Sequence, residues 1–160
     1  TTGAWCYYNN TTANGSTYGK LYNWYAVAGI YDGASLINPT LRKQLAPSGW
    51  HVASDTEWTS LSNFLGGISI AGGKMKEIGT SHWSSPNTAA TNESGFNGLS
   101  VGYLNNDGIF TSNGVSAHWW TSTALTATLA WTRTLEYNSG YAYDGYFRKY
   151  VGFSIRCVKD

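Results

Sequence analysis

The first half of the chain carries hydrophobic residues at helical spacing. Apolar side chains between Leu21 and Ala28 recur every three or four positions, and Gly29 follows as a stop, so a short helix is predicted there. Residues 31 to 48 contain glycine and two prolines and are predicted to be a loop. A weaker helix is predicted over residues 71 to 78, where a glycine pair interrupts the pattern.

The clearest helix is predicted to begin after Ser54. Ser54 and Glu57 have the spacing of a capping box, in which each side chain bonds the other residue's backbone N–H. Trp58, Leu61 and Leu65 then share one helical face, and a glycine pair ends the helix.

The second half of the chain has strand signals in place of helical ones. Short strand-like pieces at residues 98–104 and 108–111 flank Asn106-Asp107-Gly108, which predicts a hairpin. Residues 131 to 137 alternate with a period of two, which predicts a strand with one packed side. The packed side is expected to hold Trp131, Arg133, Leu135 and Tyr137, and the outer side Thr132, Thr134 and Glu136. Further strands are expected over residues 5–8, 119–123 and 152–158.

Composition narrows the class of protein. The 160 residues fit one domain, residues 1–160, and helices followed by antiparallel strands indicate an α+β fold. Charged residues make up only 12% and the net charge is +1, which argues against a nucleic-acid partner. Few charges with 19 glycines and 12 tyrosines favour an extracellular or virion protein. No apolar run reaches membrane-spanning length, so no membrane insertion is expected.

The most unusual stretch is residues 141 to 150, Tyr-Ala-Tyr-Asp-Gly-Tyr-Phe-Arg-Lys-Tyr. Tyrosine with glycine, aspartate and serine is typical of binding surfaces, because the rings give contact area at a low entropic cost. The alternative is that the rings form a small core under a loop, but Gly145, Arg148 and Lys149 interrupt the stretch and favour exposure. The sequence therefore predicts that the protein binds another macromolecule.

Three segments carry a resemblance to a known family. They are Tyr-Gly-Lys-Leu-Tyr-Asn-Trp at 18–24, Pro-Ser-Gly-Trp-His-Val-Ala-Ser-Asp-Thr-Glu-Trp at 47–58, and Gly-Phe-Ser-Ile-Arg-Cys-Val-Lys-Asp at 152–160. Together they resemble the Fibrobacter succinogenes major paralogous domain, a branch of the C-type lectin-like fold. The resemblance implies two short helices, small antiparallel sheets and long irregular loops.

Residues 119–160 also resemble the variable region of diversity-generating retroelement proteins of gut Bacteroides and their phages. In those systems adenine-directed miscopying varies surface positions on a fixed scaffold, and Arg133 and Lys149 would belong to the scaffold. Asp144, where a basic residue is usual, departs from the pattern. The resemblance implies a ligand-binding variable face built from Leu125, Ala127, Thr132, Thr134, Tyr141, Tyr143, Gly145, Tyr146, Phe147, Arg148, Tyr150 and Val151.

The same broad fold also occurs in sugar lectins and in an enzyme family, and the sequence bears on both. The calcium-ligating motifs of sugar lectins are missing from the sequence, so no metal is expected, and metal-independent glycan binding or cell-surface adhesion stays as the alternative. Formylglycine-generating enzymes share the broad fold but rely on a cysteine pair, and neither Cys6 nor Cys157 lies in a matching motif. Whether these two thiols form a disulfide stays open; many relatives have a cysteine where Ala46 stands.

Candidate catalytic groups are scattered. His51, His82 and His118 form no spaced motif, and Asp55 and Glu57 occupy a first helical turn, where negative charge favours the helix dipole. The sequence thus predicts no enzyme activity and no cofactor. It predicts a diversified receptor-binding module of a bacterial cell surface or phage tail, with a protein or glycan ligand.

Overall fold

The helices lie in the first half of the chain and the longer strands in the second, as the α+β prediction requires. The computed structural model describes residues 2–160. Its α-helices are α1 (Asn14–Tyr18), α2 (Trp24–Val27), α3 (Gly33–Ile37), α4 (Asp55–Phe64) and α5 (Ile68–Met75), with 3-10 turns at Tyr8–Asn10 and Pro39–Leu41. The strands are β1 (Trp5–Cys6), β2 (Leu21–Tyr22), β3 (Trp50–Val52), β4 (Tyr103–Leu104), β5 (Phe110–Thr111), β6 (Ser116–Ala124), β7 (Leu129–Glu136), β8 (Tyr143–Arg148) and β9 (Cys157–Lys159).

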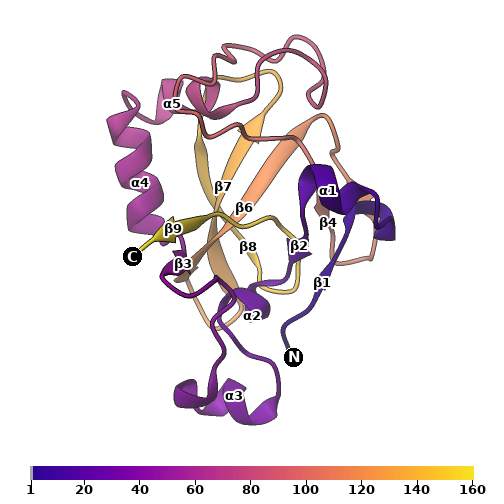
Figure 1. Ribbon diagram of the computed structural model, residues 1–160, viewed down its shortest axis with the longest axis vertical. Coiled ribbons are helices and arrows are strands. Elements are labelled where there is room, and N and C mark those ends of the chain that lie inside the picture. The colour runs from indigo at the N-terminus through magenta and orange to yellow at the C-terminus, as the bar shows by residue number, and fades with distance from the viewer. Residues whose placement is uncertain (1) are drawn as a thin grey trace.

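The centre of the molecule is an antiparallel sheet in the order β6-β7-β8 (Figure 1). Its central strand, β7, pairs Thr132 with Trp120 on β6 and with Gly145 on β8. Helices α4 and α5 lie on one side of this sheet (Figure 1). The C-terminal segment ends in β9, which pairs with β3.

Helix α4 begins where the capping-box pattern predicts. The Ser54 side chain accepts from the Glu57 backbone N–H, and the Glu57 carboxylate accepts from the Ser54 N–H at 2.8 Å. Trp58 and Leu65 of the predicted apolar face are buried against the sheet.

Both sides of the sheet are covered. On the α4 side, Trp119 and Leu135 pack in a core cluster with Trp58. On the opposite side, Trp120 and Ala130 pack with Trp24, Val151 and Phe153. β6 and β7 therefore form an internal layer, and the alternation of polar residues along β7 cannot mark one dry and one wet side.

Local elements differ from the sequence prediction in several places. Over residues 21–28 the chain first forms β2, and only then α2, which Asn23 caps. The predicted loop at 31–48 contains α3 and a 3-10 turn, because Asp32 and Ser35 form a capping box. The described residues thus form five α-helices, where the hydrophobic pattern predicts three and the family resemblance implies two. The hairpin around Asn106-Asp107-Gly108 is confirmed as the pair β4–β5.

The C-terminal segment ties the two halves of the chain together. Residues 152–154 form single bridges with Leu104, Tyr22 and Trp119, and β9 pairs with β3. Among residues 2–160, no helix has the length and apolar character needed to cross a bilayer.

Candidate ligand-binding surface

An exposed aromatic surface surrounds β8, the edge strand of the central sheet. We call it the aromatic edge and define it as Trp131, Tyr141, Tyr143, Tyr146 and Tyr150. The four tyrosines are 37–57% exposed, and Trp131 is half-buried. Exposed large rings gathered on one part of a surface indicate an interface.

The rings of the aromatic edge lie on both sides of β8. Successive strand residues point to opposite sides of a sheet, so Tyr143 and Tyr146 point away from each other. Tyr146 packs edge-to-face on Trp131, its cross-strand partner, at 6.2 Å between ring centroids. Tyr143 stacks on Tyr141 at 5.4 Å, and its hydroxyl lies 2.9 Å from the Ser139 Oγ atom. The surface is therefore an edge with two aromatic pairs, and not one flat face.

The twelve residues expected in the variable face divide into three groups. Seven are exposed: Leu125, Ala127, Tyr141, Tyr143, Tyr146, Arg148 and Tyr150. Thr134, Gly145 and Phe147 are half-buried. Thr132 and Val151 are buried, at 0% and 4% exposure.

The expected exposure of Thr132 and Val151 is wrong, and the covered sheet is the reason. Thr132 points to the same side of β7 as Ala130, into the cluster that contains Val151 and Phe153. Phe147 also packs on that cluster, 5.0 Å from Phe153 between ring centroids. These side chains support the surface from below.

Trp131 was expected inside the domain, and the structure shows it only half-buried. On the α4 side of β7, Arg133 and Leu135 are buried, whereas Trp131, nearer the start of the strand, is half-buried. The strand therefore adds Trp131 to the aromatic edge.

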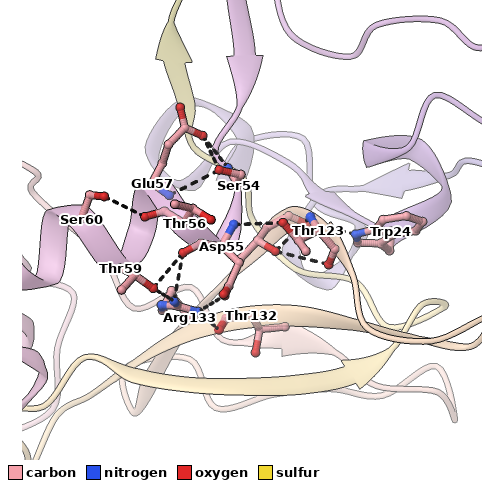
Figure 2. A network of polar contacts seen from close by, with 11 residues as sticks. Trp24, Ser54, Asp55, Thr56, Glu57, Thr59, Ser60, Thr123, Thr132 and Arg133 are labelled. Carbon is pink, nitrogen blue, oxygen red and sulfur yellow. Dashed lines mark hydrogen bonds and ion pairs between the residues drawn. The ribbon is translucent and has the colours of Figure 1, made fainter.

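Arg133 fixes helix α4 to the sheet beneath this surface, as Figure 2 shows. Arg133 is 3% exposed. Its Nη1 donates to the Asp55 carboxylate at 2.7 Å, and its Nη2 donates to the Thr59 hydroxyl at 2.9 Å. The predicted scaffold role of Arg133 thus has a physical basis, and Asp55 does more than favour the helix dipole.

Two buried lysines hold the loops on either side of the aromatic edge. Lys149 donates to the carbonyl oxygens of Thr126 and Ala127 and lies 4.2 Å from the Trp24 ring centroid. Lys76, fully buried, donates to three carbonyl oxygens, those of Thr88, Glu136 and Ser139. Burial lowers the pKa of Lys76 to about 8. The sequence offered no signal for Lys76, because all three acceptors are backbone groups distant along the chain.

The three histidines occupy separate places. His118 is buried between the Ser116 hydroxyl, 2.8 Å from Nε2, and the Thr134 hydroxyl, 3.0 Å from Nδ1. Burial lowers the pKa of His118 to about 4, so the ring is neutral at pH 7. His82 lies 2.9 Å from the Glu77 carboxylate.

His51 joins the C-terminus to helix α4. Its two ring nitrogens lie 2.6 Å from the Asp160 carboxylate and 2.7 Å from the Glu57 carboxylate, and these bonds raise its pKa. The Ser54 backbone and hydroxyl bonds, together with His51, lower the pKa of Glu57 to about 2. This arrangement gives His51 a structural role, the linking of Asp160 to the first turn of α4.

The thiols and carboxylates form no reactive cluster within the part of the chain that the structure describes. Cys6 and Cys157 are free thiols, and burial raises the pKa of each, which disfavours the nucleophilic thiolate. Residues 2–160 contain no group of three side chains placed to hold a metal ion.

Comparison with known proteins gives one result. The family model described as the Fibrobacter succinogenes major domain matches residues 1–159. No curated protein and no solved structure matches the chain.

Proposed function

The chain belongs to the Fibrobacter succinogenes major domain family, and from this premise we propose that it is a ligand-binding module with no catalytic activity. The aromatic edge contacts the ligand, which is a protein or a glycan on another cell or virion surface. We place the module in a C-type lectin-like fold outside the cell, on a bacterial surface or a phage tail.

The observation that carries this proposal is the exposure of four tyrosines around one edge strand. Tyrosine and arginine dominate the binding energy of protein interfaces, because they combine apolar area with hydrogen bonding. Tyr146 and Arg148 lie on the same side of β8, two residues apart, so one ligand can contact both.

We also propose that this surface is diversified, as the resemblance to retroelement variable proteins implies. Exposed positions tolerate substitution at a cost of about 0.5 kcal/mol or less, whereas core positions do not. The seven exposed residues of the predicted variable face meet this requirement, and the clamps of Arg133 and Lys149 hold the frame in place. Thr132 and Val151, being buried, are excluded from the proposed contact set.

Binding is tested with protein and glycan arrays probed by the full chain and by a Tyr143→Ala/Tyr146→Ala variant. Tyr31→Ala is the matched control, because Tyr31 is 43% exposed and lies outside the aromatic edge. Signals that disappear with the double variant and persist with the control support the proposal. Signals that respond equally to both variants contradict it, and the array type that responds separates a protein ligand from a glycan.

Diversification has its own test in the surrounding genome. A near-copy of residues 119–160 that differs only at adenines, beside a reverse-transcriptase gene, is the expected finding. Variation among close relatives that falls on Trp120 and Phe153 as often as on Tyr143 and Tyr146 would contradict the diversification.

A further inference from the structure

A second concave site lies away from the aromatic edge. A cavity of about 490 Å³ opens between the α1–β2 turn, the loop at residues 96–101 and the C-terminal segment at 154–156. None of the residues of the aromatic edge lines it. Its volume is within the range of about 300–1,000 Å³ that is usual for small-molecule sites.

The charged residues that line this cavity are all positive. Lys20 and Arg156 line it, and no aspartate or glutamate does. Arg156 donates to the Phe96 carbonyl at 3.2 Å and lies 4.6 Å from the Phe96 ring centroid. No carboxylate of residues 2–160 lies within 4.0 Å of its guanidinium. Arg156 is an exposed residue, and partial desolvation of its guanidinium lowers its pKa. Its charge therefore has no counter-charge and is open to a ligand.

The cavity also carries free hydroxyl groups. Ser154 is 8% exposed and uses its backbone groups on His118 and Trp120, while its hydroxyl has no hydrogen-bond partner among residues 2–160. Tyr18 and Tyr22 are among the residues that line the same cavity, and their phenol hydroxyls likewise have no hydrogen-bond partner in the described part of the chain. The lining is more polar than apolar, which does not suit a lipid-like ligand.

We propose that this cavity binds a uronic acid, a sugar that carries a carboxylate. Arg156 binds the carboxylate, because a guanidinium matches the planar geometry of a carboxylate with two parallel bonds. The hydroxyls of Tyr18, Tyr22 and Ser154 bond the ring hydroxyls, and aromatic rings in the wall cover the apolar side of the sugar. Lys20, whose ammonium lies 3.7 Å from the Trp5 ring centroid, adds positive charge at the rim.

The test is calorimetric titration of the full chain with galacturonate and glucuronate. Galactose and glucose serve as neutral controls, and acetate serves as the control for a carboxylate alone. A uronate is expected to bind roughly tenfold or more tightly than the neutral sugars and acetate, since a charge-assisted hydrogen bond is worth ~1.5–3 kcal/mol. Equal binding of neutral sugars, equal binding of acetate, or no heat with either uronate would each overturn the proposal.

Variants locate the site. Arg156→Gln is expected to weaken uronate binding by roughly tenfold or more, for the same reason. Lys159→Gln is the matched control, because Lys159 is exposed three residues away and its change removes one charge but does not touch the cavity. If Arg156→Gln melts early, Arg156→Lys keeps the charge and is expected to weaken binding through the lost second bond. Weakening by Lys159→Gln equal to that by the Arg156 variants would also overturn the proposal.

This site stands apart from the proposed function. Tyr143→Ala/Tyr146→Ala is expected to leave uronate binding unchanged, and Arg156→Gln is expected to leave the array signals of the aromatic edge unchanged. Failure of either proposal can therefore be recognised without reference to the other.

Discussion

β6 and β8 flank the same central strand, yet the aromatic residues of β6 are buried and the tyrosines of β8 are exposed. Trp119 and Trp120 of β6 are 3% and 0% exposed, whereas Tyr143 and Tyr146 of β8 are 37% and 57% exposed. The outer edge of β6 is covered, because Trp119 bridges to Ser154 of the C-terminal segment. Along residues 2–160, no strand pairs with the outer edge of β8.

The difference shows what makes a strand part of the frame, by which we mean the part of the sheet whose side chains are fixed by packing. β6 has both sides and its outer edge covered, so its rings are fixed by packing. β8 has one covered neighbour and an open edge, so its rings fill no cavity in the core. Open sheet edges are places where other chains can pair, and proteins usually protect them with charged side chains. In β8, Asp144 and Arg148 supply such charges between the rings.

The comparison is tested most strongly by Trp120→Ala. Trp120 packs against Phe153 at 4.7 Å between ring centroids, and its indole N–H donates to the Tyr22 carbonyl at 2.8 Å. The variant is expected to lower the free energy of unfolding by about 3–5 kcal/mol, measured by chemical denaturation. A loss under about 1 kcal/mol would place Trp120 outside the frame.

Acid is expected to lower the free energy of unfolding through protonation of the buried His118. Its folded pKa, about 4, lies below its ordinary value of 6.5, so the unfolded chain binds the proton more readily. Stability is therefore full above pH 6.5 and falls as the pH drops from 6.5 to 4, by at most about 3 kcal/mol. Unfolding free energy measured across this range gives the slope.

His118→Phe is the control for the acid effect. The ring stacks on Phe153 at 4.9 Å between centroids, so phenylalanine fits the shape and lacks the proton. The variant is expected to flatten the slope between pH 6.5 and 4, whatever its stability at pH 7. His51, whose pKa is raised, contributes with the opposite sign in both proteins and cancels in the difference. An unchanged slope would show that His118 does not titrate in this way.

Two local features of this protein are predicted correctly from the sequence. The capping box of α4 and the hairpin around Asn106-Asp107-Gly108 depend on residues two or three positions apart, and both form as predicted. The exposure of the four tyrosines between 141 and 150 was also predictable, because glycine and charged residues interrupt the rings, whereas Phe147 among them is half-buried.

Contacts between residues far apart in the chain could not be predicted from the sequence. Arg133 and Asp55 are 78 positions apart, and Lys76 bonds carbonyl groups that any residue type could supply. The period-two pattern of β7 identifies a strand but cannot tell that both of its sides are covered. This is why Thr132 was predicted to face solvent and is fully buried.

Thr132 gives a smaller test of which residues of the sheet are buried. Its hydroxyl is buried and has no hydrogen-bond partner within the described residues. Thr132→Val keeps the shape and removes the unpaired group, so it is expected to raise the free energy of unfolding by about 1 kcal/mol. Thr121→Val is the matched control, because the equally buried Thr121 hydroxyl accepts from the Thr123 N–H at 3.1 Å. The control is expected to lower stability by about 1 kcal/mol; the same sign in both variants would contradict the burial argument.

The smallest expected effect on stability belongs to Tyr146→Ala. Tyr146 is 57% exposed, and its main contact is the edge of Trp131, which is itself half-buried. Thermal and chemical unfolding are expected to change by about 0.5 kcal/mol or less, the range for surface substitutions. Tyr146 and Trp120 would then differ by several kcal/mol although they lie on strands that flank the same neighbour. A loss comparable to that of Trp120→Ala would make Tyr146 part of the frame, and the aromatic edge would no longer be free to bind a ligand.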